Sequence, residues 1–508
     1  MTTSRRDVLL QGCMIGAGVI AANLTGIEAW AQGVPKLRRS LHGMALNDPI
    51  LQTWRDGVRL LKAASGNVSW ATFAAIHGNT NDFNLCPHGN WYFLPWHRGY
   101  LLSYERAVRN LTGNNDFALP YWDWTEDRQM PQAFVEPLFN GQTNSLFEQD
   151  RTATPTDALP DSTVGPQIIS QILSQSPFET FGTSRPVGQN NLDQSWINCE
   201  FCGTMGQLES TPHNLVHVFV GGIMAQANSA LDPLFMMHHG NIDRIWWLWN
   251  QGGGADSPDP LWSGMTFQNN FFNPNGTPYS PKVSELLVPE PLGYTYDDTP
   301  VTPTPTPTYP PVVVAQYEKY KSLYAVPNVA VAKPSGVATF ATAVTQPAAT
   351  VAKYLEIPVD VAASALAPVA TRRSASSGAA LDGARRQFIA GARCYAFLRD
   401  LDYAQDANTE YRVFLNCNYL SAGTPTTDRH YVGSFGFFGG HHAHGGGKEP
   451  RKPSIGVDLT AAIQRIYGST ATPPEKLRVQ IQPVALKPAA KADGTARPAR
   501  VEVAIVSG

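Results

Sequence analysis

The chain has 508 residues and its charges nearly cancel, with 38 Lys and Arg against 41 Asp and Glu and a formal net charge of -3. Charged residues make up 16% of the chain, where an ordinary soluble domain has roughly 25%. No excess of positive charge would attract a polyanion, so we expect neither a nucleic-acid partner nor a membrane partner. The hydrophobic content of 43% supports a large packed core, and the length predicts two or three domains.

The first 31 residues have a pattern typical of an export signal. Arg5 and Arg6 precede an uncharged stretch that runs to Gly26, and Ala29 and Ala31 form a small-x-small cleavage site. We therefore predict a twin-arginine signal over residues 1–31, which makes the mature protein periplasmic or secreted. A membrane anchor is the alternative, but the stretch contains polar residues and several glycines and is too weakly apolar to span a bilayer comfortably.

A first group of histidines lies in residues 32–298, which we expect to form one domain of helices and long loops. His77 ends a helical pattern that starts at Trp70, and His97 begins a second pattern that continues through Leu101. His88 lies between these two patterns in a predicted loop. Two imidazoles on helices and one on a loop can converge on one metal ion.

A second group follows on a shorter spacing. His213 and His217 stand at i and i+4, so both imidazoles lie on one side of a helix. A third imidazole comes from the adjacent pair His238 and His239, which cannot both face the same way on a helix. Asp243 lies one turn after His239 and is placed to accept the other N–H of that ring. Neutral imidazoles suit copper, zinc or iron. Core or helix-terminal histidines are the alternative, but these groups take half of the chain's 12 histidines.

Two pairs of cysteines leave several interpretations open. Cys199 and Cys202 form a Cys-x-x-Cys motif, which fits a local disulfide, a redox pair, a metal knuckle or two structural thiols. Cys394 and Cys417 are a further candidate pair that the sequence does not establish.

Residues 299–311 alternate Thr and Pro and predict an extended linker that separates two domains. Beyond the linker, residues 312–508 alternate hydrophobic and other residues with a period of two, which predicts an all-β, sandwich-like domain. A helix after Asp458 interrupts the strands, and the Ala- and Ser-rich stretch 362–385 is predicted to be a loop.

Several of these segments together resemble one family, the type 3 copper proteins, which comprise tyrosinases, catechol oxidases and molluscan-type haemocyanins. The segments that carry the resemblance are 93–98, 121–124, the His213 and His217 pair, and 232–244. The resemblance implies a four-helix bundle that holds two copper ions, with O2 as co-substrate. It assigns the first copper to His77, His88 and His97, and the second copper to His213, His217 and His239.

The same resemblance suggests roles for three further residues. Cys86 stands where some members form a thioether bond to the histidine, here His88; a free buried thiol is the alternative. Glu209 and Asn214 match a pair that holds a water able to take the proton of a phenol. Their alternative roles are a first-turn carboxylate and a capping residue. Residues 224–228 are expected to line the entrance.

The C-terminal half resembles the β-domain of plant polyphenol oxidases, which covers the active site and keeps the enzyme latent. Phe435, Phe437 and Phe438 are candidates for an entrance plug, and packing in the β-domain core is the alternative. The histidines at 441–444 are assigned to a solvated loop.

The resemblance therefore implies a tyrosinase or polyphenol oxidase that hydroxylates monophenols and oxidises o-diphenols to o-quinones. Small phenols and catechols are the expected partners, and a homo-oligomer stays open. Alternatives are a catechol or o-aminophenol oxidase without strong monophenolase activity, and an O2-binding protein of the haemocyanin kind.

Overall fold

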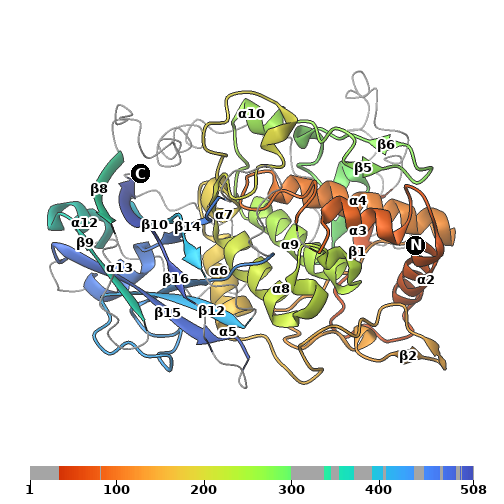
Figure 1. Cartoon of the computed structure of the whole chain (residues 1–508), viewed down its shortest axis with the longest axis horizontal. Coiled ribbons are helices and arrows are strands. Elements are labelled where there is room, and N and C mark those ends of the chain that lie inside the picture. Colours follow the sequence, from red (N-terminus) through yellow and green to blue (C-terminus); the bar gives the residue numbers. More distant parts are fainter. Residues whose placement is uncertain are drawn as a thin grey trace, which may run out of the picture.

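The computed structural model describes residues 34–80, 82–298, 337–344, 354–370, 392–403, 408–439, 451–468, 473–487, 492 and 495–506. The predicted signal, the Thr-Pro linker and the histidines at 441–444 lie outside these residues. Within them, no helix combines the length and the apolar character that crossing a membrane requires. Helices fill one end of the molecule and most strands of the C-terminal half fill the other (Figure 1).

The first half, residues 34–298, is built mainly from helices. Its helices are α2 (Pro49–Ala63), α3 (Trp70–His77), α4 (Phe93–Thr112), η2 (Gln132–Phe134), α5 (Asp161–Val164), α6 (Pro166–Leu173), α7 (Phe178–Phe181), η3 (Gln194–Trp196), η4 (Glu209–His213), α8 (Asn214–Val220), η5 (Gly222–Ala225), η6 (Ser229–Leu231), α9 (Leu234–Gln251), α10 (Pro260–Ser263), η7 (Val283–Glu285) and η8 (Glu290–Leu292). Its short strands are β1 (Lys36–Arg38), β2 (Leu138–Phe139), β3 (Gln142–Thr143), β4 (Thr204–Met205), β5 (Phe271–Phe272), β6 (Pro278–Tyr279) and β7 (Tyr294–Tyr296).

Local sequence explains where the long helices begin and how closely they pack. The Asp48 side chain accepts a hydrogen bond from the Ile50 amide at 2.9 Å and caps α2, and Ser69 caps α3 in the same way. Gly57 lets α2 approach α4, because a Cβ at this position would lie 2.7 Å from the Val108 side chain. Apolar side chains of α3, α4, α8 and α9 pack together with those of α2 in one hydrophobic core.

A buried network of ion pairs joins the start of this half to its two longest helices. Arg38 of β1 pairs with Glu105 of α4 at 2.9 Å and with Asp243 of α9 at 3.2 Å. Arg98 of α4 donates to the other oxygen of Asp243 at 2.6 Å, and Arg109 pairs with Glu105 at 2.5 Å. Because removing one partner would leave a buried charge uncompensated, the network fixes β1, α4 and α9 relative to one another.

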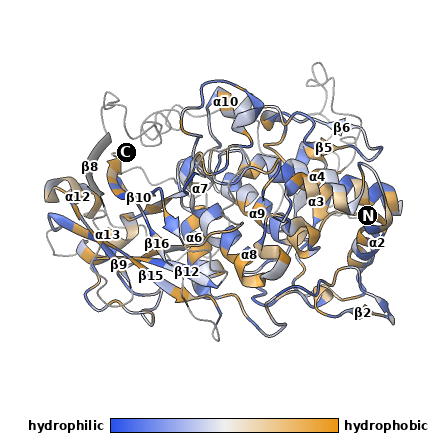
Figure 2. Cartoon of the chain, viewed as in Figure 1, coloured by the Kyte–Doolittle hydropathy of each residue, from blue (hydrophilic) through white to orange (hydrophobic). Residues whose placement is uncertain are grey.

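The described residues of the C-terminal half form two main sheets and two helices. Its elements are β8 (Val337–Val344), β9 (Leu355–Asp360), α12 (Ala363–Ala370), β10 (Arg393–Arg399), β11 (Asp402–Tyr403), β12 (Thr409–Leu415), β13 (Tyr431–Phe435), β14 (Ser454–Asp458), α13 (Thr460–Tyr467), β15 (Lys476–Ala485), β16 (Ala496–Arg497) and β17 (Arg500–Val506). The sheet orders are β4-β14-β10-β17-β8 and β13-β12-β15-β9. Apolar residues from both sheets form one core. Hydrophobic residues recur both in these strands and in the helices of the first half (Figure 2).

The structure confirms helices in the first half and sheets in the second, and it corrects two details. The stretch predicted as a loop over 362–385 begins with helix α12, whose Leu366 and Val369 side chains are buried in the core. Cys394 and Cys417 are free buried thiols rather than a pair. The four-helix bundle and the β-sandwich, as finer descriptions, stay predictions.

One strand connects the halves. Thr204 and Met205 of β4 belong to the first half by sequence, but they pair in parallel with Ser454 and Ile455 of β14. The edge of the C-terminal sheet is therefore formed by a segment that lies just before the second histidine group.

Candidate metal centre

The first cluster consists of His77, His88 and His97. His77 is the last residue of α3, His97 lies in the first turns of α4, and His88 lies in the loop between the two helices. The ring centroids are 5.4 to 5.9 Å apart. One ligand atom from each ring, together with the Cys86 sulfur, falls within 4.8 Å of the others. The structure thus brings together the three residues that the sequence placed in one group.

The second cluster consists of His213, His217 and His239, and the structure also places His238 beside them, with one ligand atom from each of the four rings within 4.8 Å of the others. His217 lies on α8 and His239 on α9, while His213 ends the π-helical turn η4. Pro212 within that turn has no N–H to donate, which favours a departure from regular α-helix there. The His213 and His217 rings are 4.7 Å apart, so the pair expected on one helix is close despite the π turn.

The two clusters face each other directly. The rings of His97 and His239 stack at 4.2 Å with an interplanar angle of 12°, and those of His88 and His213 stack at 5.6 Å. All six residues are almost fully buried. Six imidazoles from two parts of the chain therefore line a single site.

Oxygen acceptors orient four of the six rings by taking the Nδ1 proton. The acceptors are the Ala227 carbonyl for His77 at 2.6 Å, the Phe93 carbonyl for His97 at 2.8 Å, the Met224 carbonyl for His217 at 2.7 Å, and the Asn214 side-chain oxygen for His213 at 2.8 Å. Each bond leaves the Nε2 lone pair of that ring available to a metal. The segment 224–228, expected at the entrance, supplies two of these acceptors through its backbone.

The donor set fits a metal ion. Burial lowers the pKa of His77 to about 4 and that of His213 to about 3, so both imidazoles are neutral, as metal ligands must be. Their buried Nε2 atoms have no hydrogen-bond partner among the described residues. The Nε2 atoms of His217 and His239 lie 3.2 Å apart, close to the ~3.3 Å expected of two nitrogens about 2 Å from one tetrahedral ion. Imidazole ligands of this kind suit copper, zinc or iron.

Asp243 does not hold His239 as the sequence predicted. Its carboxylate accepts hydrogen bonds from Arg98 at 2.6 Å, from Arg38 at 3.2 Å, and from Tyr294 at 2.7 Å, and Tyr296 donates to it as well. The His239 Nδ1 finds no partner within the described part of the chain. The arginines attract the carboxylate more strongly than a neutral imidazole would, so Asp243 belongs to the ion network behind the site.

Cys86 lies beside the first cluster. Its sulfur is 3.8 Å from the Nε2 of His88 and 3.3 Å from the Nε2 of His97. Burial raises the pKa of the thiol well above its ordinary value. The sulfur is close enough to react with the His88 ring, and the thioether bond stays a prediction.

Glu209 and Asn214 each contact a segment that carries a histidine of the site. The buried Glu209 carboxylate accepts hydrogen bonds from the Gly89 amide at 2.7 Å and from Thr183, and burial raises its pKa to about 8. The Asn214 oxygen accepts from His213, and its amide donates to the Gly436 carbonyl at 2.9 Å. Their predicted part in holding a water stays a prediction.

The three phenylalanines proposed as a plug occupy different places. Phe438 stacks on the His217 ring at 3.9 Å and lies 5.4 Å from His88 and from His213. Phe435 and Phe437 pack within the C-terminal half, against Tyr411 at 5.3 Å and Tyr403 at 3.7 Å respectively. Phe438 is the one of the three that covers the histidines.

Sequence reasoning missed two phenylalanines, each of which packs against one imidazole of the first cluster and one imidazole of the second. Phe93 lies 4.6 Å from both His97 and His213, and Phe235 lies 4.1 Å from His239 and 4.8 Å from His77. Each phenylalanine precedes a ligand on its own helix by four residues, so helical spacing would have found them. The fold and the site define a helical metal-binding domain with two facing histidine clusters.

The comparisons with known proteins agree with this class. Residues 67–252 match the family model of the common central domain of tyrosinase. The chain is 31% identical over 294 residues to Tyrosinase HcTyr1 of Hahella sp. (54% of this chain, 56% of the relative) and 30% identical over 252 residues to the chloroplastic catechol oxidase B of Solanum tuberosum (43% and 39%). The match thus spans about half of each relative or less. The comparisons support the tyrosinase and polyphenol oxidase family for this chain.

A solved structure extends the likeness of fold to nearly the whole chain. A latent aurone synthase, a polyphenol oxidase, superposes with a TM-score of 0.63 over 94% of this chain and 90% of its own, at 18% sequence identity. The two-part architecture is therefore shared with that protein.

Proposed function

We propose that this chain is a tyrosinase or polyphenol oxidase that uses O2 and a pair of copper ions to hydroxylate monophenols and to oxidise o-diphenols to o-quinones. The observation that carries the proposal is the direct contact between two buried three-histidine clusters. Bound copper would supply O2 binding and electron transfer. Two catechols give up four electrons and four protons, and one O2 is reduced to two waters.

Within this proposal, Glu209 and Asn214 hold the water that takes the phenol proton. Support comes from their contacts with Gly89, next to His88, and with His213. Glu209→Gln and Asn214→Gly should each lower tyrosine hydroxylation more than catechol oxidation, because the role proposed for this water is to take the proton of a monophenol. Glu179→Gln, at a buried glutamate away from the site, is the matched control, and equal loss of both activities in the Glu209 and Asn214 variants would contradict the assignment.

The Cys86–His88 thioether is part of the same proposal, because the sulfur lies beside the ring. Forming the bond removes the thiol hydrogen and one ring hydrogen, and O2 takes up the two electrons. After reduction of the Cys199–Cys202 disulfide, the intact mass of the protein should still fall short of the sequence mass by two hydrogens, and Cys86 should resist alkylation after denaturation. A fully alkylated Cys86 would exclude the bond.

The proposed latency of the enzyme rests on contacts between the C-terminal half and the segment that carries His213. Thr211 donates to the Ser434 carbonyl at 2.6 Å, the Gly436 amide donates to the Ser210 carbonyl at 2.8 Å, and Phe438 covers His217. Cleavage in the Thr-Pro linker followed by release of the C-terminal half should raise the rate of catechol oxidation. An unchanged rate after complete release would reject latency.

A catechol or o-aminophenol oxidase and an O2-binding protein are the alternatives. One experiment separates them: copper-loaded protein is assayed with tyrosine, catechol and o-aminophenol, with the lag and each rate recorded. Tyrosine hydroxylation supports the proposal, catechol or o-aminophenol oxidation without it supports the second kind of oxidase, and reversible O2 uptake without turnover of any substrate supports a carrier.

We also propose export by the twin-arginine pathway, on the pattern at Arg5 and Arg6. Replacing both residues by lysine should retain the protein in the cytoplasm of a bacterial host, and unchanged export would contradict the assignment.

A further inference from the structure

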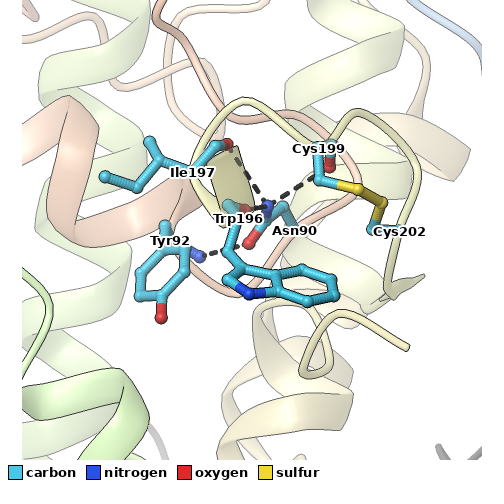
Figure 3. The surroundings of a disulfide bond; sticks show 6 residues. All are labelled: Asn90, Tyr92, Trp196, Ile197, Cys199 and Cys202. Atoms are coloured by element: carbon cyan, nitrogen blue, oxygen red, sulfur yellow. Dashed lines mark hydrogen bonds between the residues drawn. A yellow bond between two sulfur atoms is a disulfide. The ribbon is translucent and has the colours of Figure 1, made fainter. Parts of the chain in front are cut away.

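The Cys-x-x-Cys motif forms a disulfide, Cys199–Cys202, which lies near Asn90 (Figure 3). Two amides of the disulfide loop donate to this ligand loop: Phe201 to the His88 carbonyl at 3.0 Å and Gly203 to the Gly89 carbonyl at 2.7 Å. The two bonds hold the carbonyls of two consecutive peptides, His88–Gly89 and Gly89–Asn90. The loop closed by Cys199 and Cys202 therefore contacts His88, the residue of the first cluster that lies on a loop and not on a helix.

The two loops approach so closely that a side chain at residue 89 has no room. Gly89 has φ +61°, and a Cβ there would lie 2.7 Å from the Phe201 Cα. Phe201 itself adopts φ +50°, a conformation that is uncommon for a residue other than glycine. The surrounding structure must hold Phe201 in this conformation, and the adjacent disulfide restricts the same backbone.

The Asn90 side chain ties the same two segments together. It is completely buried, and its amide donates to the carbonyls of Trp196 at 2.7 Å, Ile197 at 3.3 Å and Cys199 at 3.2 Å (Figure 3). Its side-chain oxygen accepts the Tyr92 amide at 3.2 Å. One side chain thus anchors the entry to the disulfide loop to the residues that follow His88.

His88 needs this support more than the other ligands of its cluster. His77 and His97 lie on helices, and backbone carbonyls accept their Nδ1 protons. The His88 Nδ1 has no hydrogen-bond partner among the described residues. Besides the Phe83 ring, which stacks on it at 3.9 Å, and the proposed bond to Cys86, the His88 ring is positioned by the backbone of residues 88–90, which is the part that the disulfide loop holds.

We propose that the Cys199–Cys202 disulfide is a positioning element for His88, which keeps this imidazole aimed at the metal of the first cluster. The inference rests on the proposed function in so far as that metal is copper. Opening the disulfide leaves the amides of Phe201 and Gly203 free to separate from the His88 loop. The first cluster then releases its ion faster, while the second cluster, which the disulfide loop does not hold through such bonds, keeps its own.

The test compares the full-length Cys199→Ser/Cys202→Ser variant with the matched control Cys394→Ser/Cys417→Ser, which replaces two buried thiols that form no disulfide. Hydrogen exchange of the Gly89, Phe201 and Gly203 amides in the metal-free chain should speed up on the order of tenfold in the first variant alone, the size expected for opening a short disulfide loop. Copper retained against a competing chelator should fall from two ions per chain towards one.

A second measurement keeps the test decisive if the variant folds poorly. Dithiothreitol converts the disulfide of the folded wild-type chain to two thiols by giving up two electrons and two protons, and closes to its own cyclic disulfide; the same three amides should again exchange faster. Unchanged exchange after verified reduction, or equal loss of both copper ions from a folded variant, would overturn the inference. Hydrogen exchange is measured without a substrate. A chain that oxidises no phenol would therefore contradict the proposed function without contradicting the positioning role of the disulfide.

Discussion

On the proposed function and latency, Gly436→Ala should raise the catechol oxidation rate of the full-length chain. Gly436 of the C-terminal half packs against Leu215 of helix α8, and a Cβ there would stand 2.4 Å from Cδ2 and 3.0 Å from Cγ of Leu215. Carbon atoms pack at about 3.5–4.0 Å, so the covering segment must move away from α8. That displacement strains the Asn214–Gly436 hydrogen bond and moves Phe438 from His217.

The size of the rate increase follows from the cost of this close contact. Forcing an extra carbon into a packed contact costs about 1–3 kcal/mol, and a latent enzyme bears this cost in its closed arrangement alone. Since about 1.4 kcal/mol corresponds to a factor of ten, the open population should increase roughly 5- to 150-fold, until the open form dominates. The rate without protease or detergent should rise by the same factor.

Gly433→Ala is the matched control in the same segment. A Cβ at Gly433 would lie 3.2 Å from the Gln207 side-chain nitrogen, which is the flexible end of a long side chain and can move aside. Initial rates with catechol are compared for both copper-loaded variants and the wild type, and thermal unfolding checks that each is folded. Equal rates for the two variants, or a slower folded Gly436→Ala enzyme, would refute the proposed closing contact.

Three further predictions concern stability. Burial raises the pKa of Glu179 from its ordinary value to about 7, so the folded chain keeps a proton that the unfolded chain releases. The free energy of unfolding should therefore fall by about 3 kcal/mol as pH rises from 4 to 8, and urea unfolding of Glu179→Gln should lack this part of the pH dependence. Arg38→Met removes a buried partner of Glu105 and Asp243 and should lower the free energy of unfolding by about 3 kcal/mol. The control Arg39→Met, at an exposed ion pair, should lower it by less than about 0.5 kcal/mol. Similar losses in the two variants would contradict the role of the buried network. Removal of the metal by a chelator should lower Tm by several degrees, as expected for roughly 2–3 kcal/mol of binding energy, and added copper should restore it; an unchanged Tm would contradict metal binding at the clusters.

Helical spacing was sufficient to predict the positions of His77, His97, His213 and His217, four of the candidate ligands. His213 and His217 one turn apart, and His77 and His97 at the ends of apolar patterns, lie where periodicity placed them. The spacing did not predict the π turn at Pro212, because a proline near the start of a helix is equally compatible with a regular first turn. It also could not predict the acceptors at Met224 and Ala227, since every residue carries a carbonyl.

The error at Asp243 has a different cause. A carboxylate one turn after a histidine on the same helix is a reasonable local partner, but Arg38 and Arg98 approach it from distant parts of the chain. A charged donor outcompetes a neutral one for a buried carboxylate. Contacts of this kind become visible only when the tertiary structure brings the segments together.

The strand β4 makes the two halves dependent on each other's surfaces. Met205 and Phe201 pack against the C-terminal core, and β4 completes the edge of the C-terminal sheet. If the C-terminal half leaves, the first half is left with a bare strand edge and exposed apolar side chains, a combination that favours pairing with a second molecule. If release of the C-terminal half activates the protein, the activated first half would tend to self-associate. The time for which it stays active would then become shorter as its concentration rises.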